Sequence, residues 1–205
     1  MATPSKWTSK DMVPEPRDHR VTLRPTMLSD LDFVVGVEQD AANRPFITPW
    51  ERTQHEGAIR FPDARHFVVE LDAQRAGFVI LQGCRNPNRS VELKRIVLTP
   101  KGLGVGRASV RQLKKLAFTQ LGAHRFWLDV KGRNLRAQAL YRSEGFVEEG
   151  RLRECVRIDG TAKGVIHGVI HGARDADADL FDDLIVMSLL RREFDDRVAQ
   201  GRESA

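Results

Sequence analysis

The sequence is poor in cysteine and contains no long apolar run. Its 205 residues include only two cysteines, Cys84 and Cys155, which is too few for a disulfide framework and is typical of a reducing compartment. No stretch of about 18 apolar residues occurs, so no membrane-spanning helix is predicted. The first twenty residues contain three prolines and lack the apolar segment of a secretory signal. We therefore expect a cytoplasmic protein.

Two familiar nucleotide-binding loops are also missing. The P-loop pattern G-x-x-x-x-G-K-S/T does not occur. A dinucleotide-binding G-x-G-x-x-G run starting at Gly102 or Gly104 would need its third glycine at Arg107 or Ser109. These absences exclude the two motifs, but they leave a glycine-rich segment that needs another explanation.

Length and composition are those of one globular α/β domain. Hydrophobic residues make up 41% and charged residues 30% of a chain long enough to bury a substantial core. We expect a flexible tail over residues 1–18, a domain over residues 19–192 and a charged tail over residues 193–205. A tandem V-I-H-G duplication predicts an inserted loop at about residues 161–181. Glycines and β-branched residues around its two histidines argue against a helix that would make them metal ligands, so no metal is expected.

Hydrophobic periodicity predicts a mixed sheet flanked by helices. The expected strands are 19–24, 66–71, 76–82, 91–98, 124–130, 147–158 and 184–190, and the expected helices are 30–40, 53–61, 106–121 and 135–144.

Charge is unevenly distributed, although the formal net charge is only +5. Residues 85–115 contain nine lysines and arginines against one acid, whereas residues 175–196 contain eight acids against two arginines. A basic block of this kind favours a ligand that carries several phosphates. Nucleic acid is the rival partner, but neither aromatic interleaving nor a known binding module accompanies the block, so nucleic-acid binding is not expected.

The most informative segment is a glycine-rich loop, residues 101–107, between a predicted strand and a predicted helix. Gly102, Gly104 and Gly106 alternate with larger residues. The first N–H groups of a helix lack partners and its dipole favours negative charge, so such a loop can bind phosphate oxygens. A glycine-rich turn that only caps the helix is the alternative.

Two motifs in this order resemble the GNAT superfamily of acetyl-CoA-dependent N-acetyltransferases. The pattern Q/R-x-x-G-x-G/A is met from Lys101 to Gly106, with lysine where the superfamily usually has glutamine or arginine. The pattern N-x-x-A-x-x-L-Y-x-x-x-G-F is met at Asn134, Ala137, Leu140, Tyr141, Gly145 and Phe146. The resemblance covers roughly residues 20–190. It implies a single domain whose fourth and fifth strands splay apart to form the cofactor cleft.

The resemblance also implies how acetyl-CoA is held. The loop amides would bind its pyrophosphate, the strand before the loop would pair with its pantetheine arm, and an N–H of Val97 or Leu98 would face the thioester oxygen. Asn134 would cap its helix and reach the cofactor. The expected cofactor-binding residues are Ile96, Val97, Leu98, Lys101, Gly102, Leu103, Gly104, Val105, Gly106, Arg107, Asn134 and Tyr141.

Acetyl transfer also needs a general acid and a general base. Tyr141, the only tyrosine, lies seven residues after Asn134 on the same helix face and is the expected acid for the departing thiolate. Asp129 lies five residues before Asn134, where similar enzymes that acetylate protein N-termini place a glutamate base. Glu92 lies four residues before Ile96, where another branch places its glutamate. Asp129, Glu92 or neither stays open as the base.

We therefore expect an N-acetyltransferase that moves an acetyl group from acetyl-CoA to a primary amine. The amine would be a protein N-terminus, a polyamine or another small amine. A non-catalytic acyl-CoA-binding protein of the same fold is the alternative. A homodimer is compatible with these features.

Overall fold

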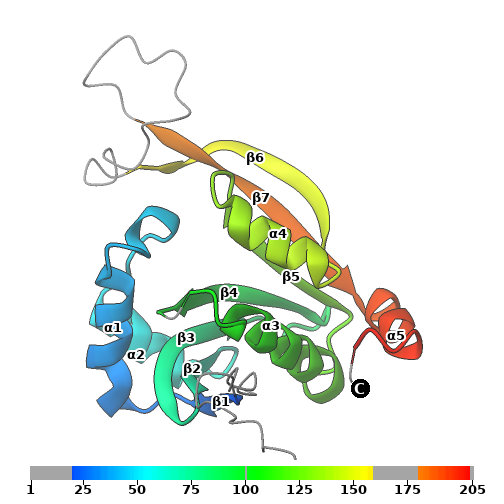
Figure 1. The fold of residues 1–205 in the computed structure, drawn as a ribbon, viewed down its shortest axis with the longest axis horizontal. Helices are drawn as coiled ribbons and strands as arrows, with labels where there is room; N and C mark the ends of the chain where they lie inside the picture. The colour runs from blue at the N-terminus through cyan, green and yellow to red at the C-terminus, as the bar shows by residue number, and fades with distance from the viewer. Residues whose placement is uncertain (1–19, 100, 159–179, 204–205) are drawn as a thin grey trace, which may run out of the picture.

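A seven-stranded mixed sheet forms the centre of the computed structural model, which describes residues 20–99, 101–158 and 180–203 (Figure 1). The strand order is β1-β2-β3-β4-β5-β7-β6, and every neighbouring pair is antiparallel except β4 and β5. The strands are β1 (Val21–Pro25), β2 (Arg65–Leu71), β3 (Gln74–Gln82), β4 (Ser90–Leu98), β5 (Arg125–Lys131), β6 (Val147–Arg157) and β7 (Phe181–Leu190). The predicted mixed α/β class is confirmed.

Helices cover both faces of this sheet (Figure 1). The helices are α1 (Leu31–Gln39), α2 (Arg52–Arg60), α3 (Val105–Lys115), α4 (Leu135–Ser143) and α5 (Arg191–Ala199), with short turns η1 (Leu28–Asp30) and η2 (Arg44–Phe46) and a π-helical end to α3, η3 (Leu116–Gln120). None of the helices in the described ranges is long and apolar enough to cross a membrane.

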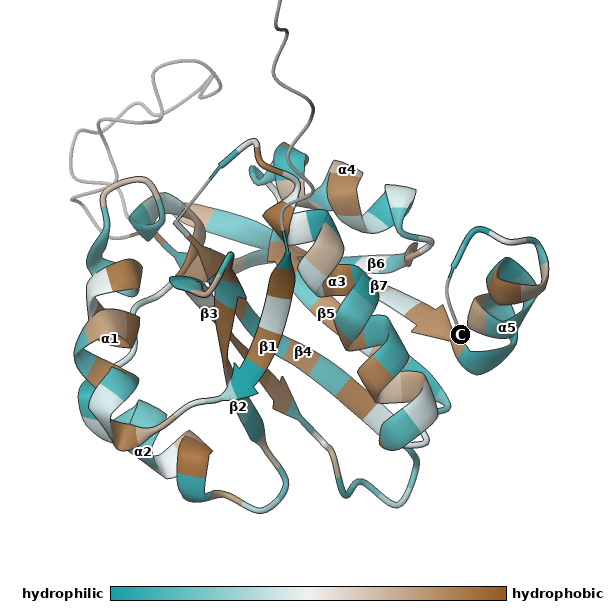
Figure 2. Ribbon diagram, turned by 60° about the horizontal axis from the view of Figure 1, so that its bottom comes forward, coloured by the Kyte–Doolittle hydropathy of each residue, from teal (hydrophilic) through white to brown (hydrophobic). Residues whose placement is uncertain are grey.

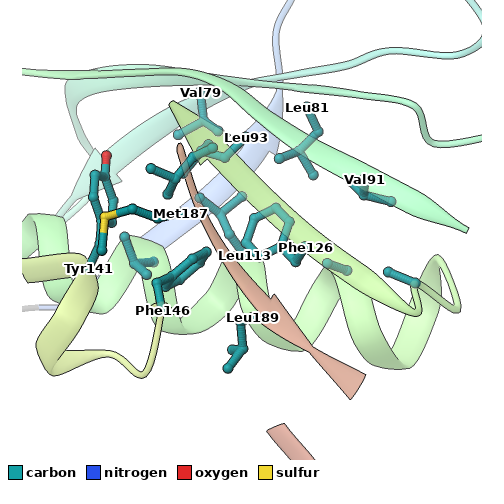
Figure 3. Close-up of a cluster of buried hydrophobic side chains, with 14 of the residues drawn as sticks. Val79, Leu81, Val91, Leu93, Leu113, Phe126, Tyr141, Phe146, Met187 and Leu189 are labelled. Atoms are coloured by element: carbon teal, nitrogen blue, oxygen red, sulfur yellow. The ribbon is translucent and has the colours of Figure 1, made fainter. Parts of the chain in front are cut away.

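Two hydrophobic clusters fix the layers, because successive strand residues point to opposite faces. Val79 and Leu81 of β3 pack with Leu113 of α3 in the larger cluster (Figure 3). Phe78 and Ile80 point the other way and pack with α1. The same alternation of hydrophobic and hydrophilic residues is visible along β4 (Figure 2). Burial of each large apolar side chain stabilises the fold by roughly 1.5–3 kcal/mol.

β4 and β5 separate soon after they meet. Their parallel pairing covers only residues 90–92 of β4 and residues 125–127 of β5. At this point β4 carries a bulge, because Leu93 and Arg95 pair with adjacent β3 residues and Lys94 is the extra residue between them. A bulge bends the strand that carries it and ends regular pairing. The splayed fourth and fifth strands are therefore confirmed, and the bulge explains where the separation begins.

The C-terminal segment differs from the charged tail expected at residues 193–205. Residues 191–199 form α5, in which Phe194 is buried and stacks on Phe118 at 4.7 Å between ring centroids. One aromatic residue among acids and arginines was too weak a signal to predict this helix. The expected tail over residues 1–18 and most of the inserted loop at 161–181, including both V-I-H-G copies, lie outside the described residues.

The C-terminal segment is also fixed by a buried lysine. The Nζ of Lys114, on the last turn of α3, donates to the Glu144 carbonyl at 2.8 Å and to its Oε2 at 3.0 Å. It donates to the Glu203 carboxylate as well. All three side chains are almost fully buried.

Lys114→Met is expected to lower the free energy of unfolding by about 3 kcal/mol, because Glu144 and Glu203 lose the buried cation that they share and keep only their less buried arginine partners. Urea unfolding measures this change. Lys115→Met is the matched control, since Lys115 is exposed, and its effect is expected to stay within about 0.5 kcal/mol. Equal stability of the two variants would contradict the role of Lys114 in fixing the C-terminal segment.

Candidate active site

A cavity of about 1300 Å³ lies between the separated parts of β4 and β5. Its walls are the end of β4, the glycine-rich loop, the first turns of α3, one side of α4, the end of β5 and residues 42–48 between α1 and α2. A volume above the usual 300–1,000 Å³ of a small-molecule site has room for a long cofactor and a second ligand. The predicted cofactor residues of β4, the loop and α4 come together here, with the exception of Leu103, which does not line the cavity.

The open edge of β4 presents backbone groups to the cavity. The Thr99 N–H donates to the Ala76 carbonyl of β3 at 2.9 Å. Because strand residues alternate in direction, the N–H of Val97 also faces β3, whereas those of Ile96 and Leu98 face the cavity. Of the two N–H groups expected at the thioester oxygen, the alternation therefore favours Leu98 over Val97.

The glycine-rich loop leaves the start of α3 open. Gly104 is the N-cap residue in the left-handed region, with φ of +74°, and no side chain caps the helix there. The first helical bond runs from the Ala108 N–H to the Gly104 carbonyl at 3.0 Å. The three preceding N–H groups, from Val105 to Arg107, come before this bond and have no helical acceptor. This geometry is the one expected of an anion-binding loop.

The cations near this loop differ in how firmly other groups hold them. Lys101 Nζ donates to Asn43 Oδ1 at 2.7 Å and to the Leu98 carbonyl at 2.8 Å, so it links the loop to the segment between α1 and α2. Arg107 pairs with Glu144 at 3.2 Å but keeps an exposed side chain. Arg136, which the sequence analysis did not single out, also lines the cavity. Arg107 and Arg136 are therefore better placed than Lys101 to meet phosphate oxygens.

Tyr141 lies in the cavity wall with its ring against Phe146, at 5.8 Å between centroids. Its hydroxyl points away from Phe146 in Figure 3, and within the described residues no hydrogen bond reaches it. Burial raises the pKa of Tyr141, and the nearby charge of Asp129 raises it further. The phenol is therefore held protonated, as a general acid requires.

Asn134 sits at the start of the same helix, and its side chain accepts a hydrogen bond from the Ala137 N–H at 3.2 Å. This confirms the predicted cap. Gly145, with φ of +93°, ends the helix and lets the Phe146 N–H reach the Tyr141 carbonyl at 3.0 Å. The second motif thus fixes both ends of α4 and with them the position of Tyr141.

The two candidate bases share one face of the sheet. Glu92 pairs in parallel with Trp127, and Asp129 lies two residues further along β5. Asp129 lines the cavity, whereas Glu92 does not. Burial raises the pKa of Glu92, its contact with Lys94 at 3.1 Å opposes this, and the charge of Asp129 adds to the rise.

The sequence analysis missed the segment between α1 and α2. Ala42, Asn43, Phe46, Ile47 and Thr48 line the cavity opposite the helices α3 and α4. This stretch carries no motif, and its only regular structure is the single turn η2. No signal in the sequence would have placed it at the site.

Splayed strands with an open backbone edge, followed by an uncapped helix start, are the features expected of an acyl-CoA-dependent transferase. The model of the Acetyltransferase (GNAT) family matches residues 34–146. The chain belongs to this family, and it is an acetyl-CoA-dependent acyltransferase that uses acetyl-CoA as co-substrate. The enzyme is thereby favoured over a non-catalytic acyl-CoA-binding protein.

Several relatives match this chain over most of their length. A spermidine N(1)-acetyltransferase of Escherichia coli K12 is 28% identical over 163 residues, which cover 74% of this chain and 86% of the relative. One from Vibrio cholerae is 31% identical over 160 residues, with 71% and 90% covered. A Vibrio cholerae spermidine N-acetyltransferase solved with CoA and spermine has a TM-score of 0.67 and 26% identity, covering 85% of this chain and 97% of that one.

Proposed function

We propose that the protein acetylates a primary amino group of a polyamine, with acetyl-CoA as the donor. The observation that carries this proposal is Asp129, the one carboxylate among the described residues that line the cavity. A carboxylate in the cavity wall attracts a cationic amine, and it attracts a substrate with more than one positive charge more strongly. The names of the relatives support the same acceptor class.

Several cations of the cavity wall are held by other groups. Arg95 pairs with Glu38 at 2.5 Å, Lys94 pairs with Glu92, and Lys131 donates to the Pro45 carbonyl at 3.4 Å. Lys101 is held by Asn43. Carboxylates therefore compensate the charges of Arg95 and Lys94, while Lys131 and Lys101 are held by neutral oxygens. The exposed Arg107 lies at the glycine-rich loop, where phosphates would bind.

In the proposed reaction β5 supplies the base, β4 supplies the oxyanion donor and α4 supplies the acid. The neutral amine attacks the thioester carbon, and Asp129 accepts the proton that the nitrogen loses. The N–H of Leu98 donates to the developing oxyanion. As the carbon–sulfur bond breaks, Tyr141 protonates the departing thiolate, which gives CoA thiol and the N-acetylated amine.

The decisive experiment follows thiol release from acetyl-CoA with spermidine, n-butylamine and a short peptide with a free N-terminus. We expect kcat/KM for spermidine to exceed that for n-butylamine at least about tenfold, because each added charge paired near the site contributes on the order of 1 kcal/mol or more. A peptide turned over better than spermidine would overturn the polyamine assignment and leave the acyltransferase in place.

Asp129→Asn is expected to lower kcat/KM about 100-fold at pH 7, whereas Glu92→Gln should lower it less than about threefold. An unshifted alkylamine has a pKa near 10.4, so its neutral fraction rises with pH. The deficit of Asp129→Asn should therefore shrink as the pH rises from 7 to 10. The opposite ranking of the two variants would make Glu92 the base.

We propose that the protein self-associates. β6 is an edge strand whose residues are almost all exposed, and a Vibrio cholerae structure with a TM-score of 0.66 is described as dodecameric. Light scattering coupled to size-exclusion chromatography tests this directly, and a monomer at micromolar concentration would refute it.

A further inference from the structure

Arg95 joins β4 to the segment between α1 and α2. Its side chain is only 10% exposed. Its Nη1 donates to Glu38 Oε1 at 2.5 Å and to the Thr48 carbonyl at 2.9 Å. The guanidinium also stacks on Trp50, 4.5 Å from the ring centroid. One side chain thus contacts Glu38 before the cavity-lining segment, Thr48 at its end and Trp50 just after it.

Glu38 completes this connection from inside the protein. It is fully buried on α1, and its second oxygen accepts the Trp50 N–H at 2.6 Å. His55 of α2 lies 3.5 Å from the same oxygen. The Glu38 carboxylate therefore fixes Trp50 directly and Thr48 through Arg95.

The fixed segment forms a wall of the cavity. Phe46, Ile47 and Thr48 line it, as does Arg95 itself. Because this stretch contains only a single turn of regular structure, side-chain contacts must determine its position. The Lys101–Asn43 contact holds its beginning next to the glycine-rich loop, and Arg95 holds its end.

We propose that Arg95 is a positioning residue for the acceptor amine. Because it ties Thr48 and Trp50 to β4, Arg95 sets the width of the cavity on the acceptor side without touching acetyl-CoA. The inference rests on the proposed function, because it takes the amine to enter between Asp129 and residues 46–48. Its loss should weaken amine binding and leave cofactor binding unchanged, since the glycine-rich loop is held by other contacts.

A double variant separates positioning from stability. Arg95→Met leaves Glu38 buried without its cation and is expected to lower the Tm strongly. Adding Glu38→Gln removes both charges, which often restores stability. We expect the double variant to recover most of the lost Tm, while its amine KM stays at least about tenfold above that of the parent. The Kd for acetyl-CoA, measured by calorimetry, should change less than about twofold.

Arg24 supplies a matched control. It ties β1 to Asp30 at 2.7 Å and to Glu70 at 2.8 Å, and it does not line the cavity. Arg24→Met and Arg24→Met/Asp30→Asn should lower the Tm and leave the amine KM within about twofold. If lower stability alone raised the amine KM, the Arg24 variants and the Arg95 variants would show the same increase.

Recovery of both Tm and amine KM in the Arg95→Met/Glu38→Gln variant would overturn the proposal and make Arg95 a structural residue. A parallel loss of acetyl-CoA affinity would overturn it too. If the double variant does not fold, Arg95→Lys and Arg24→Lys are compared by the same criteria, since lysine keeps the charge and loses the planar fork. KM is measured with the amine that the parent protein turns over best. If this amine is not a polyamine, the proposed function is wrong, but the test of Arg95 is still valid.

Discussion

Tyr141→Phe is expected to lower kcat about 100-fold, the usual contribution of a positioned general acid. Only a hydroxyl is lost, and the ring keeps its contact with Phe146. Fold and acetyl-CoA affinity should therefore be retained. The loss should appear in kcat rather than in KM, because the proton is needed only as the carbon–sulfur bond breaks. Steady-state thiol release and calorimetric titration measure the two quantities separately.

The raised pKa of Tyr141 gives this prediction a pH signature. Since the phenol stays protonated in the folded protein, its ionisation should not lower kcat between pH 8 and 10. Tyr141 is the only tyrosine, so phenolate absorbance reports on it alone. The absorbance change should be absent up to pH 10 in the native protein and appear near the ordinary value of 10 after unfolding in urea.

Asp129→Asn is the control for this titration. It removes the charge that adds to the raised pKa, so the phenolate should form at a lower pH than in the parent, while burial still keeps the pKa of Tyr141 above its ordinary value.

Turnover of Tyr141→Phe within about threefold of the parent would remove Tyr141 from the mechanism. A loss confined to acetyl-CoA affinity would make it a binding residue instead.

The elements that could be predicted from the sequence are those with local signals. Periodicity located α3 and α4 and the strands around them, because amphipathic patterns extend over many residues. The Asn134 cap and the Gly145 stop are short-range rules, and both hold in the structure. The glycine-rich loop and Tyr141 line the same cavity, as the two motifs predicted.

What could not be predicted depends on contacts distant in sequence. The bulge at Lys94 is set by pairing with β3. The segment at residues 42–48 is positioned by Arg95 and Lys101, more than 40 residues later in the chain. Both features shape the wall of the cavity, and neither leaves a pattern in its own local sequence.

The three loop glycines show the same limit. They look equivalent in sequence, but Gly102 and Gly104 have positive φ and open space where a Cβ would stand. A Cβ on Gly106 would instead lie 3.3 Å from the Leu140 side chain of α4. Gly106 therefore allows α3 to approach α4, and substitutions there would mix packing with binding. Gly104 gives the cleaner test of the phosphate loop.

Gly104→Asp is expected to raise the Kd for acetyl-CoA at least about 100-fold. The new carboxylate would project into the cavity at the start of α3, where it would compete with the pyrophosphate for the open N–H groups and repel its charge. Aspartate tolerates the left-handed region better than most residues, so the backbone at +74° should be kept. Calorimetric titration with acetyl-CoA measures the change.

Gly104→Asn is the matched control, because asparagine has nearly the same shape, the same tolerance of positive φ and no charge. It should weaken acetyl-CoA binding less than aspartate does, and the difference between the two variants should shrink at high salt. The Tm of both variants should agree within a few degrees, which excludes unfolding as the cause. Binding of acetyl-CoA by Gly104→Asp with the affinity of the parent would show that the pyrophosphate lies elsewhere, and the role assigned to the glycine-rich loop would be wrong.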